Sequence, residues 1–285
     1  MSINFIAEVS SNHSRDINRS LSFVRKAAEI GCDSVKFQLF KIDELFAPEI
    51  LKKSSEIASR KDWELPLEFL EPLSNECKKE NIKFSCTPFY LGAVDELFPY
   101  VDFYKIASYE LLWDELLIKC ANTEKPLIIS TGMANISEID HAVKIIKSNG
   151  CKDLTLMHCT SSYPAPFDQS NLSAIKTIRE HTGCKVGWSD HTFDPGVISR
   201  SVNKWGASAI EFHLDLEGKG EEYSSGHCWL PNEMASVITD IKHGILADGN
   251  GIKEPAECEM VERDWRADPS DGLRPFKKIR EDWNS

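Results

Sequence analysis

Two histidines stand at the ends of two neighbouring apolar segments of this sequence. His191 closes the segment CKVGWSDH, and His213, 22 residues later, closes ASAIEFH. Two imidazoles delivered by adjacent strands suit a divalent transition metal that keeps open coordination positions, as catalytic metal sites do. The spacing therefore predicts that His191 and His213 share one metal, with Asp190 orienting a ligand or binding substrate. Each histidine is also compatible with a buried structural role, and that alternative stays open.

Lysine and hydroxyl side chains stand in or at the ends of other apolar segments. Lys36 and Lys105 lie within two of these segments, and Ser130 and Ser189 lie near the ends of two more. Ammonium groups together with hydroxyls suit an oxyanion such as phosphate or carboxylate. The same lysines are compatible with buried ion pairs, for example with Glu8, and Lys105 is also compatible with Schiff-base chemistry.

The elements that must position these side chains are eight short apolar segments, most of which lead into an amphipathic stretch. In order, they are INFIAEV, SVKFQLF, IKFSCTPF, DFYKIAS, KPLIISTG, DLTLMHCTSS, CKVGWSDHT and SAIEFHLDL. This alternation predicts βαβ units and an α/β fold, a (β/α)8 TIM barrel over residues 1–250. Chemistry in such a barrel lies where the strands end, which is where the polar side chains stand. An open doubly wound sheet is the alternative, but no GxGxxG follows the first segment.

The last part of the chain, residues 251–285, differs in kind from the barrel. It is strongly charged and contains a turn rich in proline and glycine over 268–275. A segment of this length cannot form its own hydrophobic core. We expect a short C-terminal helical tail that packs on the barrel or on a partner subunit.

Composition excludes several classes of function. The 285 residues include 33 basic and 45 acidic side chains, a formal charge of −12, which argues against a nucleic-acid partner. The nine cysteines are irregularly spaced without a CxxC pair, which is typical of reduced thiols in a cytoplasmic protein rather than of a disulfide frame. We see neither a signal-peptide pattern nor an apolar run of the ~20 residues that a membrane helix needs.

Taken together, the segments resemble the N-acetylneuraminate (sialic acid) synthase family. The matching stretches are AEVSSNH, AAEIGCDSVKFQ, FSCTPF, FYKIASYE, PLIISTGM, LMHCTSSYPAP, VGWSDHT and IEFHLDL, in the family's order. The resemblance implies a TIM barrel that condenses phosphoenolpyruvate with an N-acylated amino-sugar aldehyde, such as ManNAc. The implied product is a nine-carbon 2-keto acid, with release of phosphate. It also implies a divalent metal, Mn²⁺ or Mg²⁺, and a homodimer.

The resemblance assigns a role to each matching residue. His191 and His213 match the metal positions, and Glu8 matches a carboxylate proposed to handle the proton of the attacking water. The positions that match phosphoenolpyruvate contacts are Lys36, Thr87, Lys105, Ser108, Ser130, Ser161 and Ser189. Glu110 and Tyr163 match positions near the acceptor sugar, and Gln38, Asp190 and His227 are expected to contact the sugar from their places at strand ends and in the loop after the eighth segment.

Two features depart from the family's pattern. Family members commonly continue into a small antifreeze-like domain that caps the partner's site and contributes an arginine; this sequence ends at Ser285 without such a domain, and Arg274 or another tail residue is expected in that role. The loop after the eighth segment reads EGKGEEYSSGHCWLP where the family has a PGPD-like stretch, so Glu221, Glu222 or His227 is expected to replace its aspartate. A Schiff-base aldolase or lyase using Lys105, and a non-catalytic sugar-binding relative, remain the alternative functions.

Overall fold

A computed structural model describes residues 3–283, except for the side chain of Glu221, so the expectation placed on Glu221 lies outside the described residues. Strands β1 to β8 follow one another around one parallel sheet in chain order, and β1 also pairs with β8, which closes the sheet. The predicted (β/α)8 barrel is confirmed. The strands are β1 (Asn4–Glu8), β2 (Ser34–Leu39), β3 (Lys83–Pro88), β4 (Phe103–Ile106), β5 (Leu127–Ser130), β6 (Leu154–Cys159), β7 (Lys185–Asp190), β8 (Ala209–Leu214) and the two-residue β9 (Cys228–Trp229).

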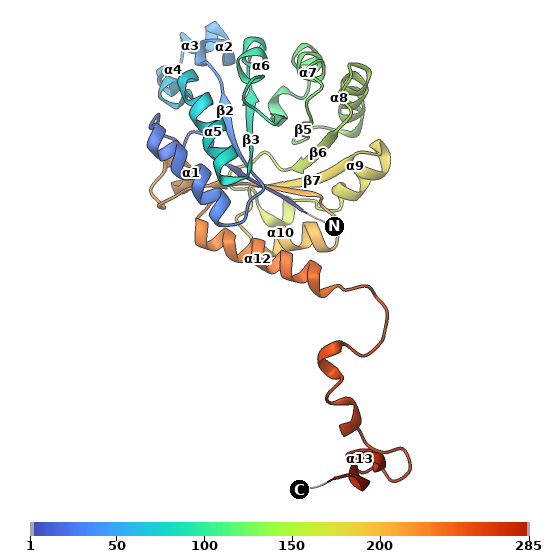
Figure 1. Ribbon diagram of the computed structural model, residues 1–285. Helices are drawn as coiled ribbons and strands as arrows, with labels where there is room; N and C mark the ends of the chain where they lie inside the picture. The colour runs from blue at the N-terminus through green and yellow to red at the C-terminus, as the bar shows by residue number, and fades with distance from the viewer. Residues whose placement is uncertain (1–2, 284–285) are drawn as a thin grey trace. The chain divides into compact units, whose positions relative to one another are not determined.

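Helices connect successive strands and surround the sheet (Figure 1). They are α1 (Ile17–Glu29), α2 (Ile42–Leu45), α3 (Pro48–Leu51), α4 (Ser55–Ser59), α5 (Leu70–Glu80), α6 (Leu91–Leu97), α7 (Asp114–Ala121), α8 (Ile136–Ser148), α9 (Ala174–Thr182), α10 (Pro195–Asn203), α11 (Glu221–Ser224), α12 (Pro231–Ala247) and α13 (Lys277–Glu281). The short helices α2, α3 and α4, followed by a 3₁₀ turn at Arg60–Trp63, form an insertion after β2 that the sequence patterns did not predict.

The barrel interior changes from apolar to polar along the strands. One buried cluster joins Ile6, Phe103, Ile128, Met157 and Ala209, which belong to β1, β4, β5, β6 and β8. Because side chains on one face of a strand recur every second residue, the next inward positions lie two residues further along. Those positions are Glu8, Lys105, Ser130, Cys159 and Glu211. The apolar layer thus supports a polar layer nearer the carboxyl ends of the strands.

The chain divides into two compact units, Met1–His243 and Gly244–Ser285. The second unit contains α13 and the 3₁₀ turns Glu257–Glu259 and Arg263–Trp265. Within it, the rings of Trp265 and Trp283 meet edge-on with centroids 5.2 Å apart. Among residues 3–283, the structure shows no helix that is both long and apolar enough to cross a membrane.

Candidate active site

The carboxyl ends of the barrel strands surround a cavity of about 840 Å³. Most of the residues predicted for the site line this cavity: Glu8, Lys36, Gln38, Lys105, Ser108, Glu110, Ser130, Tyr163, Ser189, His191, His213 and His227. Thr87, Ser161 and Asp190 are not among its lining residues. The fold therefore brings most of the candidate side chains, which are spread over more than 200 residues of sequence, to one cavity.

Two lysines and two carboxylates form a buried ion cluster on the cavity floor. Lys36 Nζ lies 2.7 Å from Glu8 Oε2 and 4.0 Å from Glu211 Oε1, and Lys105 Nζ lies 3.3 Å from the same Glu211 oxygen. Burial opposes the charge of Lys36, but Glu211 and Glu8 outweigh it and raise its pKa above the ordinary value. Burial prevails for Lys105 and lowers its pKa, although Glu211 acts against it. The two lysines are therefore electrostatically unequal.

Hydroxyl groups surround the ammonium groups. Lys105 Nζ donates to Ser130 Oγ at 2.6 Å, and Lys36 Nζ donates to Thr87 Oγ1 at 3.3 Å. Ser189 Oγ donates to Glu211 Oε1 at 3.2 Å. Thr87 thus contacts the ion cluster through Lys36 although it does not line the cavity. The predicted cations and hydroxyls do converge on one region.

Gly132 permits a close approach of three side chains beside this region. A Cβ at Gly132 would lie 2.3 Å from Ser161 Oγ and 2.8 Å from Ser108 Oγ, closer than Cβ atoms approach other atoms in proteins, and 3.0 Å from Cys159 Sγ, so these side chains would have to move. The Gly132 N–H donates to Ser108 Oγ at 3.1 Å. Ser161 Oγ is buried without a hydrogen-bond partner among the described residues. This strand end is a small polar recess in which Ser161 keeps unused hydrogen-bonding capacity.

The two histidines singled out in the sequence lie together, with ring centroids 5.5 Å apart. His191 Nδ1 lies 2.8 Å from the carbonyl oxygen of Thr160. Because a carbonyl only accepts, Nδ1 carries the proton and Nε2 keeps its lone pair. Burial, helped by the nearby His213, lowers the pKa of His191 to about 3, so the ring is neutral.

The carboxylate of Glu222 orients the imidazole of His213, as the carbonyl of Thr160 orients that of His191. His213 Nδ1 lies 3.0 Å from Glu222 Oε2, which orients the ring with Nε2 away from Glu222. Burial opposes the charge of His213, but the hydrogen bond and charge of Glu222 raise its pKa above the ordinary value. Histidines that bind metals usually donate their other ring N–H to a carbonyl or a carboxylate, as His191 and His213 do here. The donor set therefore fits a divalent metal.

The residues assigned to the sugar half occupy different positions. Glu110 and Gln38 line the cavity, and the ring of Tyr163 lies 4.3 Å from that of His191 by centroid. Burial raises the pKa of Glu110 to about 7, and its Oε2 has no hydrogen-bond partner among the described residues. Asp190 is fully buried instead. Its carboxylate accepts from the indole N–H groups of Trp188 and Trp229, at 3.0 and 3.3 Å, and from Thr192 Oγ1 and the Phe193 N–H, at 2.7 and 3.3 Å. That geometry favours a role in fixing the loop after β7 over direct contact with substrate.

A comparison with protein-family models identifies the family of this chain. The model described as "NeuB family" matches residues 23–253. The chain belongs to the NeuB family. An uncharacterized protein of Methanocaldococcus jannaschii is 37% identical over 260 residues, covering 90% of this chain and 75% of that protein. The N,N'-diacetyllegionaminic acid synthase of Campylobacter jejuni is 37% identical over 271 residues, covering 90% and 80%.

Solved structures agree with this assignment. The N-acetylneuraminic acid (sialic acid) synthetase of Leptospira borgpetersenii, in complex with citrate, superposes with a TM-score of 0.81 at 29% identity. The match covers 95% of this chain and 93% of that one. The resemblance drawn from the sequence motifs is therefore confirmed at the level of the family, and the chain is similar to nonulosonic acid synthases.

Some cavity residues of this NeuB-family chain were not predicted for the site, among them Glu211, which bridges both lysines. Glu222, which was expected to replace the family's aspartate, contacts His213 from the loop after β8. Glu211 was detectable, because it lies two residues before His213 on one strand and so shares its face. Arg60 and Trp63 enter from the insertion after β2, and the Arg60 guanidinium carbon lies 5.0 Å from the Trp63 ring centroid. No sequence pattern pointed to those two residues.

Proposed function

We propose that this chain condenses phosphoenolpyruvate with an N-acylated amino-sugar aldehyde, such as ManNAc or a related sugar, with the help of a divalent metal. The products are a nine-carbon 2-keto acid and inorganic phosphate. The observation that carries the proposal is the presence of two buried lysines and two oriented imidazoles on the wall of one cavity. The kinship with nonulosonic acid synthases supports the same reaction class.

The lysine side of the cavity would bind phosphoenolpyruvate. Lys36, Lys105 and Ser130 supply donors, and Ser108 and Ser161 supply hydroxyls beside Gly132. Charge-assisted hydrogen bonds of this kind are the strong ones for phosphate and carboxylate groups. The ion cluster is formally balanced, with Glu8 and Glu211 facing the two ammonium groups. The additional positive charge of a metal would therefore strengthen the binding of an anionic substrate.

His191 and His213 would hold that metal through their Nε2 atoms, given the partners of both Nδ1 atoms. A bound Mn²⁺ or Mg²⁺ would act as a Lewis acid that polarises the aldehyde oxygen. The chain's contribution is to fix the orientation of both imidazoles through the Nδ1 contacts to Thr160 and Glu222, so that each Nε2 points away from those partners. The ring of Tyr163, 4.3 and 5.9 Å by centroid from those of His191 and His213, covers this side of the site.

In the proposed reaction the enol carbon of phosphoenolpyruvate forms a bond to the aldehyde carbon. Water adds to the former enol-phosphate carbon, and the bond from that carbon to the phosphate oxygen breaks. Glu8 would take a proton from that water, and the alkoxide formed from the aldehyde oxygen would take up a proton to become a hydroxyl. Glu8 Oε1 accepts from Gln38 Nε2 at 2.5 Å and its Oε2 pairs with Lys36 Nζ at 2.7 Å, so the group is held in one orientation.

The sugar would occupy the part of the cavity lined by Glu110, Tyr163 and His227, with Gln38 at its edge. The carboxyl of Glu110, whose pKa burial raises to about 7, offers both a donor and an acceptor near neutral pH. A cavity of about 840 Å³ accommodates a six-carbon amino sugar beside a three-carbon phosphoester. Arg60 and Trp63 line the same cavity and add a cation and an aromatic face.

One observation favours a second candidate function. The pKa of Lys105 is lowered by burial, and a neutral buried amine is what a Schiff-base aldolase or lyase requires. Borohydride reduction in the presence of pyruvate would trap a covalent adduct on Lys105 in that case. The synthase proposal predicts no adduct and loss of activity with EDTA.

The deciding experiment is phosphate release from phosphoenolpyruvate with a panel of acetamido sugars and Mn²⁺, with mass detection of the nine-carbon product. Lys105→Met should raise the apparent KM for phosphoenolpyruvate, because it removes an ammonium from the phosphate half. His191→Asn should abolish release with little change in melting temperature. Folded, metal-loaded protein that releases no phosphate with any sugar of the panel would argue for a non-catalytic sugar-binding relative instead.

A further inference from the structure

Four metal-ligating side chains meet at the junction of β8 and β9. They are His213, Glu222, His227 and Cys228, and one donor atom from each lies within 4.8 Å of the others. We call this group the β9 cluster. His227 is 5% exposed, and its Nε2 lies 3.8 Å from Glu222 Oε2.

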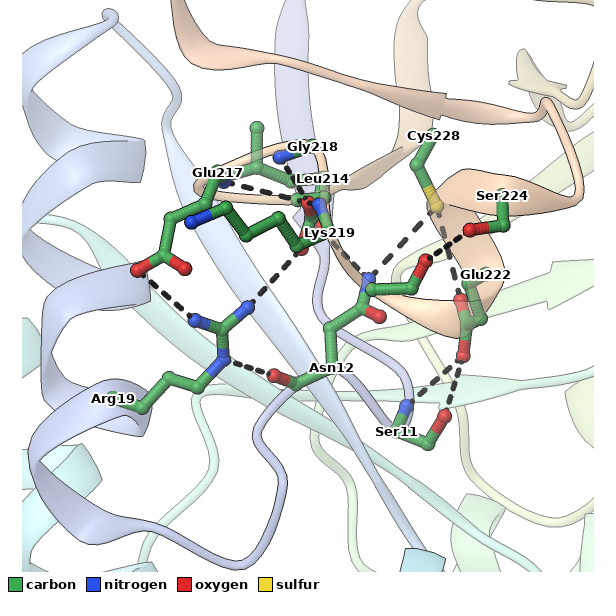
Figure 2. Close-up of polar contacts among 12 residues, drawn as sticks. Ser11, Asn12, Arg19, Leu214, Glu217, Gly218, Lys219, Glu222, Ser224 and Cys228 are labelled. Carbon is green, nitrogen blue, oxygen red and sulfur yellow. Dashed lines mark hydrogen bonds and ion pairs between the residues drawn. The ribbon is translucent and has the colours of Figure 1, made fainter.

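The carboxylate of Glu222 is held by Ser11, which follows β1, the strand that pairs with β8 to close the barrel. Glu222 Oε1 accepts from the Ser11 N–H at 3.2 Å and from Ser11 Oγ at 2.8 Å (Figure 2). Its other oxygen, Oε2, faces His213 Nδ1 at 3.0 Å, His227 Nε2 at 3.8 Å and Cys228 Sγ at 4.0 Å. Ser11 thus fixes Glu222 so that one oxygen points at three potential ligands.

The loop that carries Glu222 is anchored as well. The buried carboxylate of Asp215 accepts from the N–H groups of Gly218 and Lys219, at 2.6 and 3.2 Å, and pairs with Arg19 at 3.1 Å. Arg19 Nε also donates to the Asn12 carbonyl at 2.6 Å. The loop after β8 is therefore tied to the loop after β1 before any ligand binds. A preorganised donor set binds a metal more tightly than a flexible one.

We propose that His213, Glu222, His227 and Cys228 bind a zinc-like transition-metal dication as a closed four-ligand site that is distinct from the His191 and His213 pair. Two imidazoles, a carboxylate and a thiolate are a ligand set that Zn²⁺ accepts in tetrahedral geometry. The thiolate and carboxylate balance both charges of the ion, which limits the cost of burying it. On binding, the Cys228 thiol proton leaves to solvent, and His213 holds its ring proton on Nε2 so that Nδ1 presents its lone pair to the ion.

The observed distances are close to those that such a site needs. Donors about 2.0–2.3 Å from a tetrahedral ion are about 3.3–3.8 Å from one another. The distances from Glu222 Oε2 to the other three donors are 3.0, 3.8 and 4.0 Å, and all four donors lie within 4.8 Å of one another. Some donor pairs would therefore have to approach by about 1 Å, a change that rotamer adjustments of the two side chains provide.

The His191 and His213 pair uses His213 Nε2, and the β9 cluster uses His213 Nδ1. Because a neutral imidazole has one nitrogen lone pair, the occupancies of the two sites exclude each other. Where the proposed synthase function holds, an ion in the β9 cluster withdraws His213 from the pair that serves the reaction, and zinc becomes an inhibitor. The softer thiolate ligand favours Zn²⁺ over Mn²⁺ or Mg²⁺ in the β9 cluster. The two sites therefore discriminate between metals by ligand softness.

Co²⁺ titration of the metal-free full chain tests the β9 cluster without any substrate. Thiolate ligation gives Co²⁺ an intense near-ultraviolet charge-transfer band that nitrogen and oxygen ligands do not give. We expect this band in the wild type and its loss in Cys228→Ser. The matched control is Cys159→Ser, which removes another buried thiol, one that lines the active-site cavity outside the β9 cluster, and should keep the band. His191→Asn should also keep it, because His191 is not in the β9 cluster.

A second variant guards against failure of Cys228→Ser to fold. His227→Gln keeps the thiolate, so the band should remain while Co²⁺ affinity falls on the order of 100-fold. Folded wild-type protein that binds Co²⁺ without the band, or a band that persists in Cys228→Ser, overturns the proposal. Failure of phosphate release with every sugar leaves the cobalt spectrum untouched, so the two proposals fail independently.

Discussion

Glu110 provides a quantitative test of how far burial in the cavity raises the pKa of a carboxyl group. The residue is 8% exposed, its Oε2 has no partner among the described residues, and burial raises its pKa to about 7 against the opposing effects of its own backbone N–H, Lys105 and Lys36. The unfolded chain has the ordinary value of 4.5. Between these two pKa values the folded state binds more protons than the unfolded chain. The contribution of Glu110 to the free energy of unfolding is therefore fully present below pH 4.5 and is lost as the pH rises through 7.

The magnitude follows from the two pKa values. They differ by about 2.5, and each unit corresponds to about 1.4 kcal/mol, so the whole effect is about 3.5 kcal/mol. Glu110→Gln keeps the shape and removes the titration. Relative to this variant, the wild type should lose about 2.5 kcal/mol of unfolding free energy between pH 5 and pH 8.

Urea unfolding of both proteins at several pH values measures this difference directly. Glu180→Gln, on the exposed side of α9, serves as the matched control and should follow the wild type across the same range. A difference between wild type and Glu110→Gln that stays constant with pH, or that changes with the opposite sign, would show that Glu110 is ionised throughout and that the cavity solvates it.

Two further predictions concern the barrel and its loops. Gly187→Ala should destabilise the protein by about 1–3 kcal/mol in thermal unfolding, because the new Cβ would lie 2.5 Å from the carbonyl oxygen of Ala209. The control is Gly244→Ala, where a Cβ would have no atom within 4 Å; it should be neutral or stabilising. Asp215→Asn should cost about 2 kcal/mol, because it weakens the ion pair with Arg19 and the hydrogen bonds from the loop amides; an unchanged melting temperature would show that the loop is anchored elsewhere.

The barrel was predictable because its strands leave a strong local signal. Each of the eight apolar segments became a strand, and in each the side chains near the carboxyl end turn polar. The insertion after β2 left no such signal. Its helices are only four or five residues long, too short for an amphipathic repeat, and Pro48 and Pro66 interrupt the pattern. Arg60 and Trp63 were missed for that reason.

The contacts of Glu222 could not be predicted from the sequence for a different reason. Ser11 and Glu222 are 211 residues apart, and they meet only because closure of the barrel places β1 beside β8. Periodicity describes which face of an element a residue occupies, but not which loop crosses above it. His191 and His213 were found because both stand at strand ends, whereas the carboxylate that orients His213 comes from a loop.

The two buried lysines illustrate what closure of the barrel adds to the chemistry. Lys36 faces Glu8 and Glu211 and stays an ammonium, whereas Lys105 faces Glu211 alone and burial lowers its pKa. An anion bound beside Lys105 supplies the missing countercharge and raises the population of its ammonium form, so anion binding and protonation of Lys105 strengthen each other. A Schiff base requires the opposite, a neutral amine at the same atom. Phosphoenolpyruvate would therefore suppress adduct formation at Lys105 as it binds, and competition between phosphoenolpyruvate and borohydride-trapped pyruvate would reveal which form of Lys105 the cavity is built to hold.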